Sequence, residues 1–182
     1  MTGRVATRLI LPVGPRDHIL GSPTAPVTLV EYGDFECSHC AQAHEVVKAL
    51  LKHLGRQLRF TYRHFPLSTV LPHAEAAAEA AEAAGAQHKF WPMHDILFEH
   101  QEALENESLM FYGNALALEM PRYLNDLASH IHAVKVRDDF MSGVQSGVNG
   151  TPSFFINGIR HEDSFDFDVL LAAIDAATEE TV

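Results

Sequence analysis

The chain has 182 residues, of which 47% are hydrophobic and 20% charged, as expected for one soluble domain or for one domain with an insertion. Its 24 acidic residues outnumber 13 lysines and arginines, and the net charge of -11 argues against nucleic acid and anionic lipid as partners. The apolar run at residues 9–13 is too short for a signal-peptide core, and no run reaches the ~20 residues of a membrane span.

The first predicted unit opens on an alternating apolar stretch. Residues 27–33, "VTLVEYG", are rich in β-branched and aromatic side chains and predict a strand. A helical period of apolar residues follows over about 38–54, and Gly55 is a typical C-terminal cap for that helix. Residues 57–65, "QLRFTYRHF", predict a second strand that stops at Pro66. Together these elements predict a right-handed βαβ unit with parallel strands.

The middle of the chain, residues 68–148, has helical patterns only. An Ala-rich stretch carries Glu75, Glu79 and Glu82 along one face, which we expect to be solvated. The segment 88–104 is amphipathic and aromatic, and it predicts a helix that packs into a core. We therefore expect an all-helical insertion.

Strand patterns return near the C-terminus. Residues 154–156 and 159–161 flank Asn157-Gly158, a strong signal for a hairpin with a two-residue turn. A last helix is expected over about 166–178, with Ser164 as its cap. The chain thus predicts an α/β fold in three parts: an N-terminal extension (1–24), a sheet domain (25–67 and 149–182) and an inserted helical domain (68–148).

The two cysteines of the chain, Cys37 and Cys40, lie three positions apart at the expected start of the first helix. A bridge between them would close a loop too small to stabilise the fold, so a chemical role explains them better. Free N–H groups and the helix dipole favour a thiolate on Cys37, the attacking species in disulfide exchange. Cys40 belongs to the apolar stripe and should react second. A protonated His39 would stabilise the Cys37 thiolate further and make the disulfide more oxidising.

Two other interpretations stay open. Cys37, Cys40 and His44 have the spacing C-x2-C-x3-H, and zinc could bind there if His64 or His161 supplied a fourth ligand. The chain has no second cysteine pair, and its closing ligand is ambiguous, so we expect no metal. The third interpretation is an interaction domain of the same fold without redox turnover, which two intact thiols argue against.

Three features together resemble one protein family. These are "EYGDFECSHCAQAH", the helical block and "GVNGTPSFFING". They resemble the DsbA-like branch of the thioredoxin superfamily, and the resemblance runs from about Ala25 to Ala177. Within that branch the sequence is similar to small bacterial thioredoxin domains that stand alone or follow a sodium/proton antiporter. The resemblance implies a thioredoxin fold, βαβ then β-hairpin and helix, with an all-helical insertion of the DsbA type.

The resemblance also implies roles for particular residues. Cys37 attacks and Cys40 resolves, the Thr151-Pro152 pair forms a cis-proline loop that binds substrate beside them, and Glu31 relays protons near the resolving thiol. The motif reads Cys-Ser-His-Cys, with Ser38-His39 where DsbA has Pro-His.

These roles describe a protein-disulfide oxidoreductase or isomerase that needs no cofactor. Its partners would be protein or small-thiol disulfides and a redox protein that recycles it, with no nucleic acid or membrane partner. We expect a cytoplasmic location, or a periplasmic one if a leader was removed. A reducing cytoplasm favours reductase or isomerase work, whereas the periplasm favours oxidase work.

Overall fold

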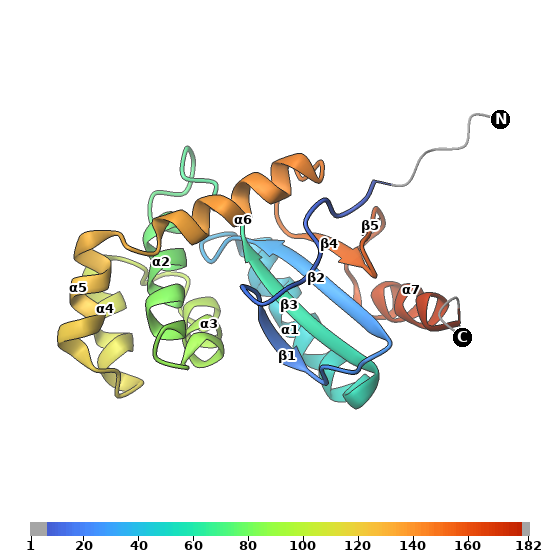
Figure 1. The fold of residues 1–182 in the computed structure, drawn as a ribbon, viewed down its shortest axis with the longest axis horizontal. Coiled ribbons are helices and arrows are strands. Elements are labelled where there is room, and N and C mark those ends of the chain that lie inside the picture. Colours follow the sequence, from blue (N-terminus) through green and yellow to red (C-terminus); the bar gives the residue numbers. More distant parts are fainter. Residues whose placement is uncertain (1–6, 180–182) are drawn as a thin grey trace.

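The computed structural model describes residues 7–179, which form one five-stranded sheet, seven α-helices and a short 3₁₀ helix (Figure 1). The strands are β1 (His18–Gly21), β2 (Val27–Gly33), β3 (Leu58–His64), β4 (Ser153–Ile156) and β5 (Ile159–His161). The helices are α1 (Ser38–Leu54), η1 (Gly55–Gln57), α2 (Ala74–Gly85), α3 (Phe90–Glu99), α4 (Asn106–Ala115), α5 (Met120–Ser129), α6 (Ala133–Gln145) and α7 (Phe167–Glu179).

The sheet has the strand order β1-β3-β2-β4-β5. Strands β2 and β3 are parallel and joined through α1, which confirms the predicted βαβ unit. Strands β4 and β5 are antiparallel, and Asn157 and Gly158 between them have φ angles of 47° and 80°. This left-handed conformation suits Asn and Gly and produces the predicted hairpin. The α/β thioredoxin fold with a helical insertion is therefore confirmed.

The sequence analysis placed the first strand at Val27, but the structure contains an earlier one. Strand β1 pairs antiparallel with β3 at one edge of the sheet. It has only four residues, three of them exposed, so its sequence lacks the alternation that marks a half-buried strand. The segment is held by the buried Arg63, which pairs with Asp17 at 2.8 Å and donates to the carbonyl oxygen of Leu11.

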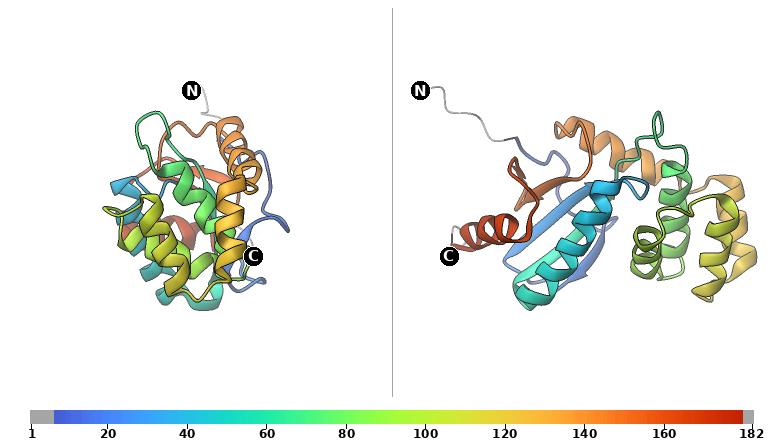
Figure 2. Two further views of the ribbon diagram at one scale, coloured as in Figure 1. Left: turned by 90° about the vertical axis from the view of Figure 1, so that its left-hand side faces the viewer. Right: turned by 180° about the vertical axis from the view of Figure 1, so that it is seen from behind.

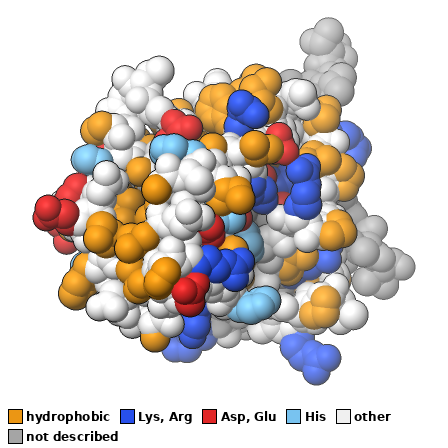
Figure 3. Space-filling model, turned by 60° about the vertical axis from the view of Figure 1, so that its left-hand side comes forward, with side chains coloured by type: hydrophobic (Ala, Val, Ile, Leu, Met, Phe, Trp, Pro, Cys, Tyr) orange, Lys and Arg blue, Asp and Glu red, His pale blue; other side chains and the backbone are white. Residues whose placement is uncertain are grey.

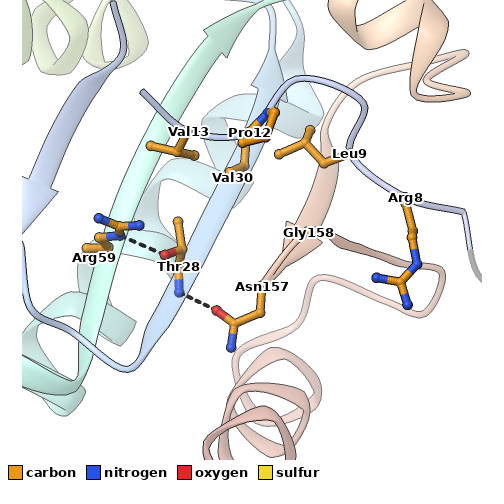
Figure 4. Close-up of a pocket in the computed structure, with 9 residues that line it drawn as sticks. All are labelled: Arg8, Leu9, Pro12, Val13, Thr28, Val30, Arg59, Asn157 and Gly158. Carbon is orange, nitrogen blue, oxygen red and sulfur yellow. Dashed lines mark hydrogen bonds between the residues drawn. The ribbon is translucent and has the colours of Figure 1, made fainter. Parts of the chain in front are cut away.

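The segment before β1 passes over one face of the sheet (Figure 4). Leu9, Pro12 and Val13 lie beside the central strand, and a cavity of about 330 Å³ remains between this segment and the strand. On the floor of the cavity, Thr28 accepts a hydrogen bond from Arg59 Nε at 2.7 Å. None of the predicted site residues lines this cavity, so it is separate from the cysteine motif.

Both faces of the central sheet are covered. Seen from behind, α1 lies across one face, and α7 packs beside it (Figure 2). On the other face a smaller core forms around Val30, Tyr32 and Phe155, where Phe140 of α6 packs in. Because β2 is buried on both faces, its sequence reads as a nearly continuous apolar run. No helix within residues 7–179 combines the length and apolar character that crossing a membrane requires.

Helices α2 to α5 stand beyond one end of the sheet (Figure 1). A cavity of about 360 Å³ there is lined mainly by residues of α2, α4 and α5. Figure 3 shows hydrophobic side chains gathered over this helical part of the molecule. The exposed apolar residues of α4 and α5 include Met110, Phe111 and Leu124.

The acidic stripe on α2 corrects the expectation of a solvated face. Glu75 is exposed, but Glu79 and Glu82 are buried. Glu79 pairs with His130 at 3.0 Å, and Glu82 pairs with His64 at 2.8 Å. A helix whose other side chains are mostly alanine lets neighbouring elements approach closely on several sides. The two carboxylates are therefore enclosed, and the pairing with histidines offsets the cost of burying them.

Candidate active site

The cysteine motif lies at the N-terminal end of α1. A Cβ atom at Gly33 would lie 2.5 Å from the Tyr62 ring, so glycine lets that ring pack against the end of β2. The chain then turns, and Cys37 sits just before α1 with an extended backbone (φ -81°, ψ 121°). The amides of Cys40 and Ala41 donate to the Cys37 carbonyl oxygen at 3.0 and 3.2 Å, which starts the helix. Both cysteines are free thiols, with Cys37 partly buried and Cys40 fully buried.

The electrostatic environment of Cys37 favours the thiolate. A hydrogen bond from the Cys40 side chain lowers the pKa of Cys37 to about 4, against the opposing effect of burial. Thr151 and the backbone amides of Cys40 and His39 contribute to the same shift. At neutral pH the Cys37 sulfur is therefore ionised and partly open to solvent, which is the state of an attacking or leaving thiol.

Cys40 has the opposite character. Burial raises its pKa well above the ordinary value, and the hydrogen bond to Cys37 and the charge of Glu31 act in the same direction. The backbone amide of Asp34 lies 3.5 Å from Cys40 Sγ. Cys40 is thus a protonated, shielded thiol beside an exposed thiolate.

Glu31 lies on the central strand β2 close to both thiols. Its side chain is 1% exposed, and its Oε1 atom has no hydrogen-bond partner in the described part of the chain. Burial, together with the negative charge of Cys37, raises the pKa of Glu31 to about 8. This carboxyl group is therefore able to hold or release a proton near neutral pH.

The other predicted site residues flank the thiols. The Cys37 sulfur lies 3.6 Å from the carbonyl oxygen of Thr151, and the Thr151–Pro152 peptide bond is cis. This loop therefore meets the start of α1 although more than a hundred residues separate them in sequence. Ser38 and His39 are exposed on the first turn of α1. Their side chains stand open to solvent beside Cys37.

The helical part of the molecule reaches the site through Gln101, which the sequence analysis missed. Gln101 Nε2 donates to the carbonyl oxygens of Phe35 at 2.7 Å and of Cys37 at 2.9 Å. These two bonds hold the loop on which Cys37 lies. No sequence signal marks Gln101, because its partners are backbone carbonyl groups that any sequence provides.

Asp34 supports the same loop from the other side. Its carboxylate accepts hydrogen bonds from the amides of Glu36 at 2.8 Å and of Leu67 at 2.7 Å. Burial raises the pKa of Asp34 to about 6. The hydrogen bond from Glu36 forms a local turn in which the aspartate side chain accepts from the amide two residues later. Aspartate commonly forms such turns, so the sequence could have indicated this one.

The metal set considered from the sequence does not assemble. His44 lies against α3 rather than beside the cysteines, and its Nε2 atom is 3.8 Å from Asp95. His64 pairs with Glu82 at 2.8 Å, and His161 bonds to the Ser164 carbonyl oxygen at 2.9 Å. Among residues 7–179 two groups have the spacing of metal ligands, and neither contains a cysteine. The alternative ligand set of Cys37, Cys40 and His44 is therefore not assembled in the described part of the chain.

Comparison with known sequences finds one family over most of the chain. A sequence model described as thioredoxin matches residues 14–176. The chain is 46% identical over 170 residues to the Na(+)/H(+) antiporter NhaA 1 of Salinispora arenicola, and 42% identical over 171 residues to NhaA of Herminiimonas arsenicoxydans. These matches cover 93% of this chain but only 26% and 27% of the relatives. The chain thus spans about a quarter of the length of these antiporters.

Comparison with solved structures shows the same fold. Oxidised BdbD from Bacillus subtilis superposes with a TM-score of 0.83 at 20% identity, covering 96% of this chain and 98% of that one. The α-DsbA1 protein of Wolbachia pipientis gives a TM-score of 0.80 at 20% identity, with coverage of 97% and 98%. A thioredoxin-like oxidoreductase from Silicibacter pomeroyi gives 0.80 at 24% identity, with coverage of 91% and 94%. At these identities the likeness is one of fold.

Proposed function

The chain belongs to the thioredoxin family, and from this premise we propose that it is a thiol-disulfide oxidoreductase acting on protein disulfides. The observation that carries the proposal is the asymmetry of the two thiols. Cys37 is a partly exposed thiolate at a helix start, and Cys40 is a buried thiol held close to it. A pair of this kind needs no cofactor, because the two sulfurs themselves accept and return the two electrons.

The low pKa of Cys37 favours oxidation of substrate dithiols. In the first step a substrate thiolate attacks Cys37 Sγ of the Cys37–Cys40 disulfide. That bond breaks, a mixed disulfide forms, and Cys40 leaves and takes a proton from Glu31. In the second step another substrate thiolate attacks the substrate sulfur of the mixed disulfide and releases Cys37 as a thiolate. A thiol of low pKa is a good leaving group, so this direction is fast.

The reverse reaction uses the same groups. The Cys37 thiolate attacks a substrate disulfide, Cys40 gives its proton to Glu31, and Cys40 then attacks Cys37 Sγ and releases the reduced substrate. In isomerisation the exchange goes no further than the mixed disulfide on Cys37. A thiolate of the same substrate then releases Cys37 as a thiolate, and Cys40 is not used. We assign oxidation as the main direction because the thiolate stabilises the reduced protein. A redox partner that accepts two electrons must then restore the disulfide.

The loop at Thr151 is the proposed binding site for the polypeptide chain of the substrate. Its carbonyl oxygen lies against the Cys37 sulfur, and β4 begins two residues later. A substrate segment in extended form can pair with this backbone in the manner of an added strand. Pro152 completes the loop, and Ser38 and His39 lie on the exposed first turn of α1. We further propose that residues 68–148 act as an inserted domain whose Gln101 supports the Cys37 loop beside the Thr151 loop.

The experiment that tests the function is trapping with a Cys40→Ser variant. Without Cys40, a mixed disulfide on Cys37 has no internal thiol to resolve it, so the variant should accumulate covalent complexes with scrambled ribonuclease. The matched control is the Cys37→Ser/Cys40→Ser double variant, which should accumulate none. A Cys40→Ser protein that forms no such complexes, together with a wild type that fails to oxidise a dithiol peptide, would refute the proposal.

A further inference from the structure

A second cluster of polar side chains lies one helical turn beyond Cys40, between α1 and α3. His44 of α1 and His94 of α3 are 4% and 3% exposed, and their ring centroids are 5.2 Å apart. Asp95 follows His94, and its side chain is 49% exposed. One ligand atom from each of these three residues lies within 4.8 Å of the others. The cluster takes no part in the thiol chemistry described above.

The separations within the cluster are close to those of a metal site. His94 Nδ1 is 3.1 Å from Asp95 Oδ1, and His44 Nε2 is 3.8 Å from the same oxygen. Glu45 brings a fourth atom, because its Oε1 is 4.0 Å from His44 Nε2. Zinc with nitrogen and oxygen ligands at ~2.0–2.1 Å in a tetrahedron places neighbouring ligand atoms roughly 3.3–3.4 Å apart. Side-chain rotations that bring the three clustered atoms closer together and turn Glu45 toward them would therefore complete a tetrahedron.

Two ring nitrogens of the cluster, His44 Nε2 and His94 Nε2, are buried without a partner among the described residues, and the first of them faces the other ligands. Native structures contain few buried polar atoms in this state, because such an atom has lost its hydrogen bonds to water without gaining others.

We propose that His44, His94 and Asp95 bind a zinc ion, with Glu45 as the fourth ligand. Two neutral imidazoles and two carboxylates would balance the charge of the ion. Lys48 is the nearby cation, with its Nζ atom 3.5 Å from both Glu45 Oε1 and Glu99 Oε1. When Glu45 turns to the metal, Lys48 keeps Glu99 as its partner. The exposed carboxylates of Asp95 and Glu45 give the ion a path from solvent.

The other group with ligand spacing among the described residues also has an unpartnered ring nitrogen, His64 Nδ1, but its carboxylates are already paired. In the cluster of His64, Glu82 and Asp139, the carboxylate of Asp139 already pairs with Lys135 Nζ at 2.6 Å. Glu82 is shared by two histidines. A metal there would have to displace an ammonium group from a buried site that nothing opens to solvent. We therefore assign the ion to the cluster around His44.

A metal in this place would join two parts of the molecule. Helix α1 carries Cys40 and His44 on one face, whereas α3 belongs to the helical part that also carries Gln101. Zinc bound between them would fix the distance from the cysteine-bearing helix to the segment that supports its loop. The expected role is structural, because the cluster is separate from the sulfur atoms.

The test uses the full-length protein with the Cys37–Cys40 disulfide formed, so that no thiolate can bind metal. Calorimetric titration with zinc sulfate should show one ion per chain, and zinc should raise the thermal unfolding midpoint. Cobalt(II) should give visible bands typical of tetrahedral coordination and no sulfur-to-cobalt charge-transfer band.

Two variants decide which side chains bind. Asp95→Asn should weaken zinc binding by more than about 10-fold, a loss that even outer-shell partners can cause. Glu107→Gln is the matched control, since it removes an exposed carboxylate on α4 that belongs neither to the cluster nor to the Lys48 pairs and should leave affinity unchanged. His44→Phe should abolish binding, and Asp95→Asn remains decisive if that variant fails to fold. Absence of zinc binding by the oxidised wild type, or equal affinity in Asp95→Asn, would overturn the proposal.

Discussion

Lowering the pH from 7 to 4 should remove a stabilising contribution of Cys37 from the reduced protein. The folded state holds this thiol at a pKa of about 4, whereas its ordinary value is 9.0. A group with a depressed pKa stabilises the fold fully when the pH is above the pKa of the unfolded chain. This contribution is lost as the pH falls toward the pKa of the folded state. Three pH units at ~1.4 kcal/mol each give about 4 kcal/mol between pH 7 and pH 4. Because the side chain is only partly buried, solvent screening reduces the expected change to about 2–4 kcal/mol.

The assay is urea unfolding of reduced wild type and reduced Cys37→Ala at each pH from 4 to 8. Glu31 and Asp34 also titrate in this range, and the charge of Cys37 raises the pKa of both, so the difference in unfolding free energy reports Cys37 together with its coupling to these two carboxyl groups. That difference should grow as the pH rises from 4 to 7. The oxidised wild type serves as a second control, because it has no thiol to titrate.

A difference between the two reduced proteins that stays constant from pH 4 to 7 would refute the reasoning. It would mean that Cys37 has the same pKa in the folded and unfolded chains, so that the helix start and the Cys40 thiol do not stabilise the thiolate. The proposed preference for substrate oxidation would then lose its physical basis.

Three further changes test the surroundings of the thiols. The pKa of Glu31 is raised from an ordinary 4.5 to about 8, so the wild type should lose unfolding free energy as the pH rises from about 5 to 8. The oxidised Glu31→Gln variant should lack this loss in urea unfolding. Identical pH slopes for the two proteins would contradict the prediction. His39→Leu should raise the pKa of Cys37 and make the disulfide less oxidising in equilibrium with glutathione, whereas an unchanged equilibrium would assign the thiolate to the helix start alone. Gln101→Ala removes two hydrogen bonds from the active-site loop and should cost about 1–3 kcal/mol of unfolding free energy and slow alkylation of Cys37. Gln87→Ala is its control, because Gln87 is half-buried and also makes two hydrogen bonds, both to the backbone of Glu119. Equal effects of the two changes on the alkylation of Cys37 would exclude a special role for Gln101.

The elements that could be predicted from the sequence are those with a local signal. The strand at 27–33, the helix after it and the strand at 58–64 follow from apolar periodicity, and the hairpin follows from Asn157-Gly158. The position of Cys37 at a helix start came from the same patterns. Each depends on residues within about ten positions of one another, where sequence and backbone conformation are directly coupled.

What could not be predicted depends on residues far apart in the chain. Strand β1 is short and exposed, and it is held by a long-range ion pair to Arg63. The burial of Glu79 required His130, 51 positions away, to come beside it. The sequence offered His44 as a partner for the cysteines because they share a helix, but tertiary packing directs it to His94. Such pairings are decided by how the helices pack, which periodicity alone does not encode.

Glu82 has a consequence for how the molecule is put together. Its carboxylate, on α2, accepts a hydrogen bond from His18 at the start of β1 and another from His64 at the end of β3. One side chain therefore links three segments: α2, β1 and β3. Without α2 in place both imidazoles would lose their shared partner, so the position of the edge strand is coupled to the position of α2. A pull on residues before β1, as from a polypeptide joined to that end, would therefore be transmitted to the helical part. The N-terminal strand and the helical insertion are thus linked through one buried carboxylate.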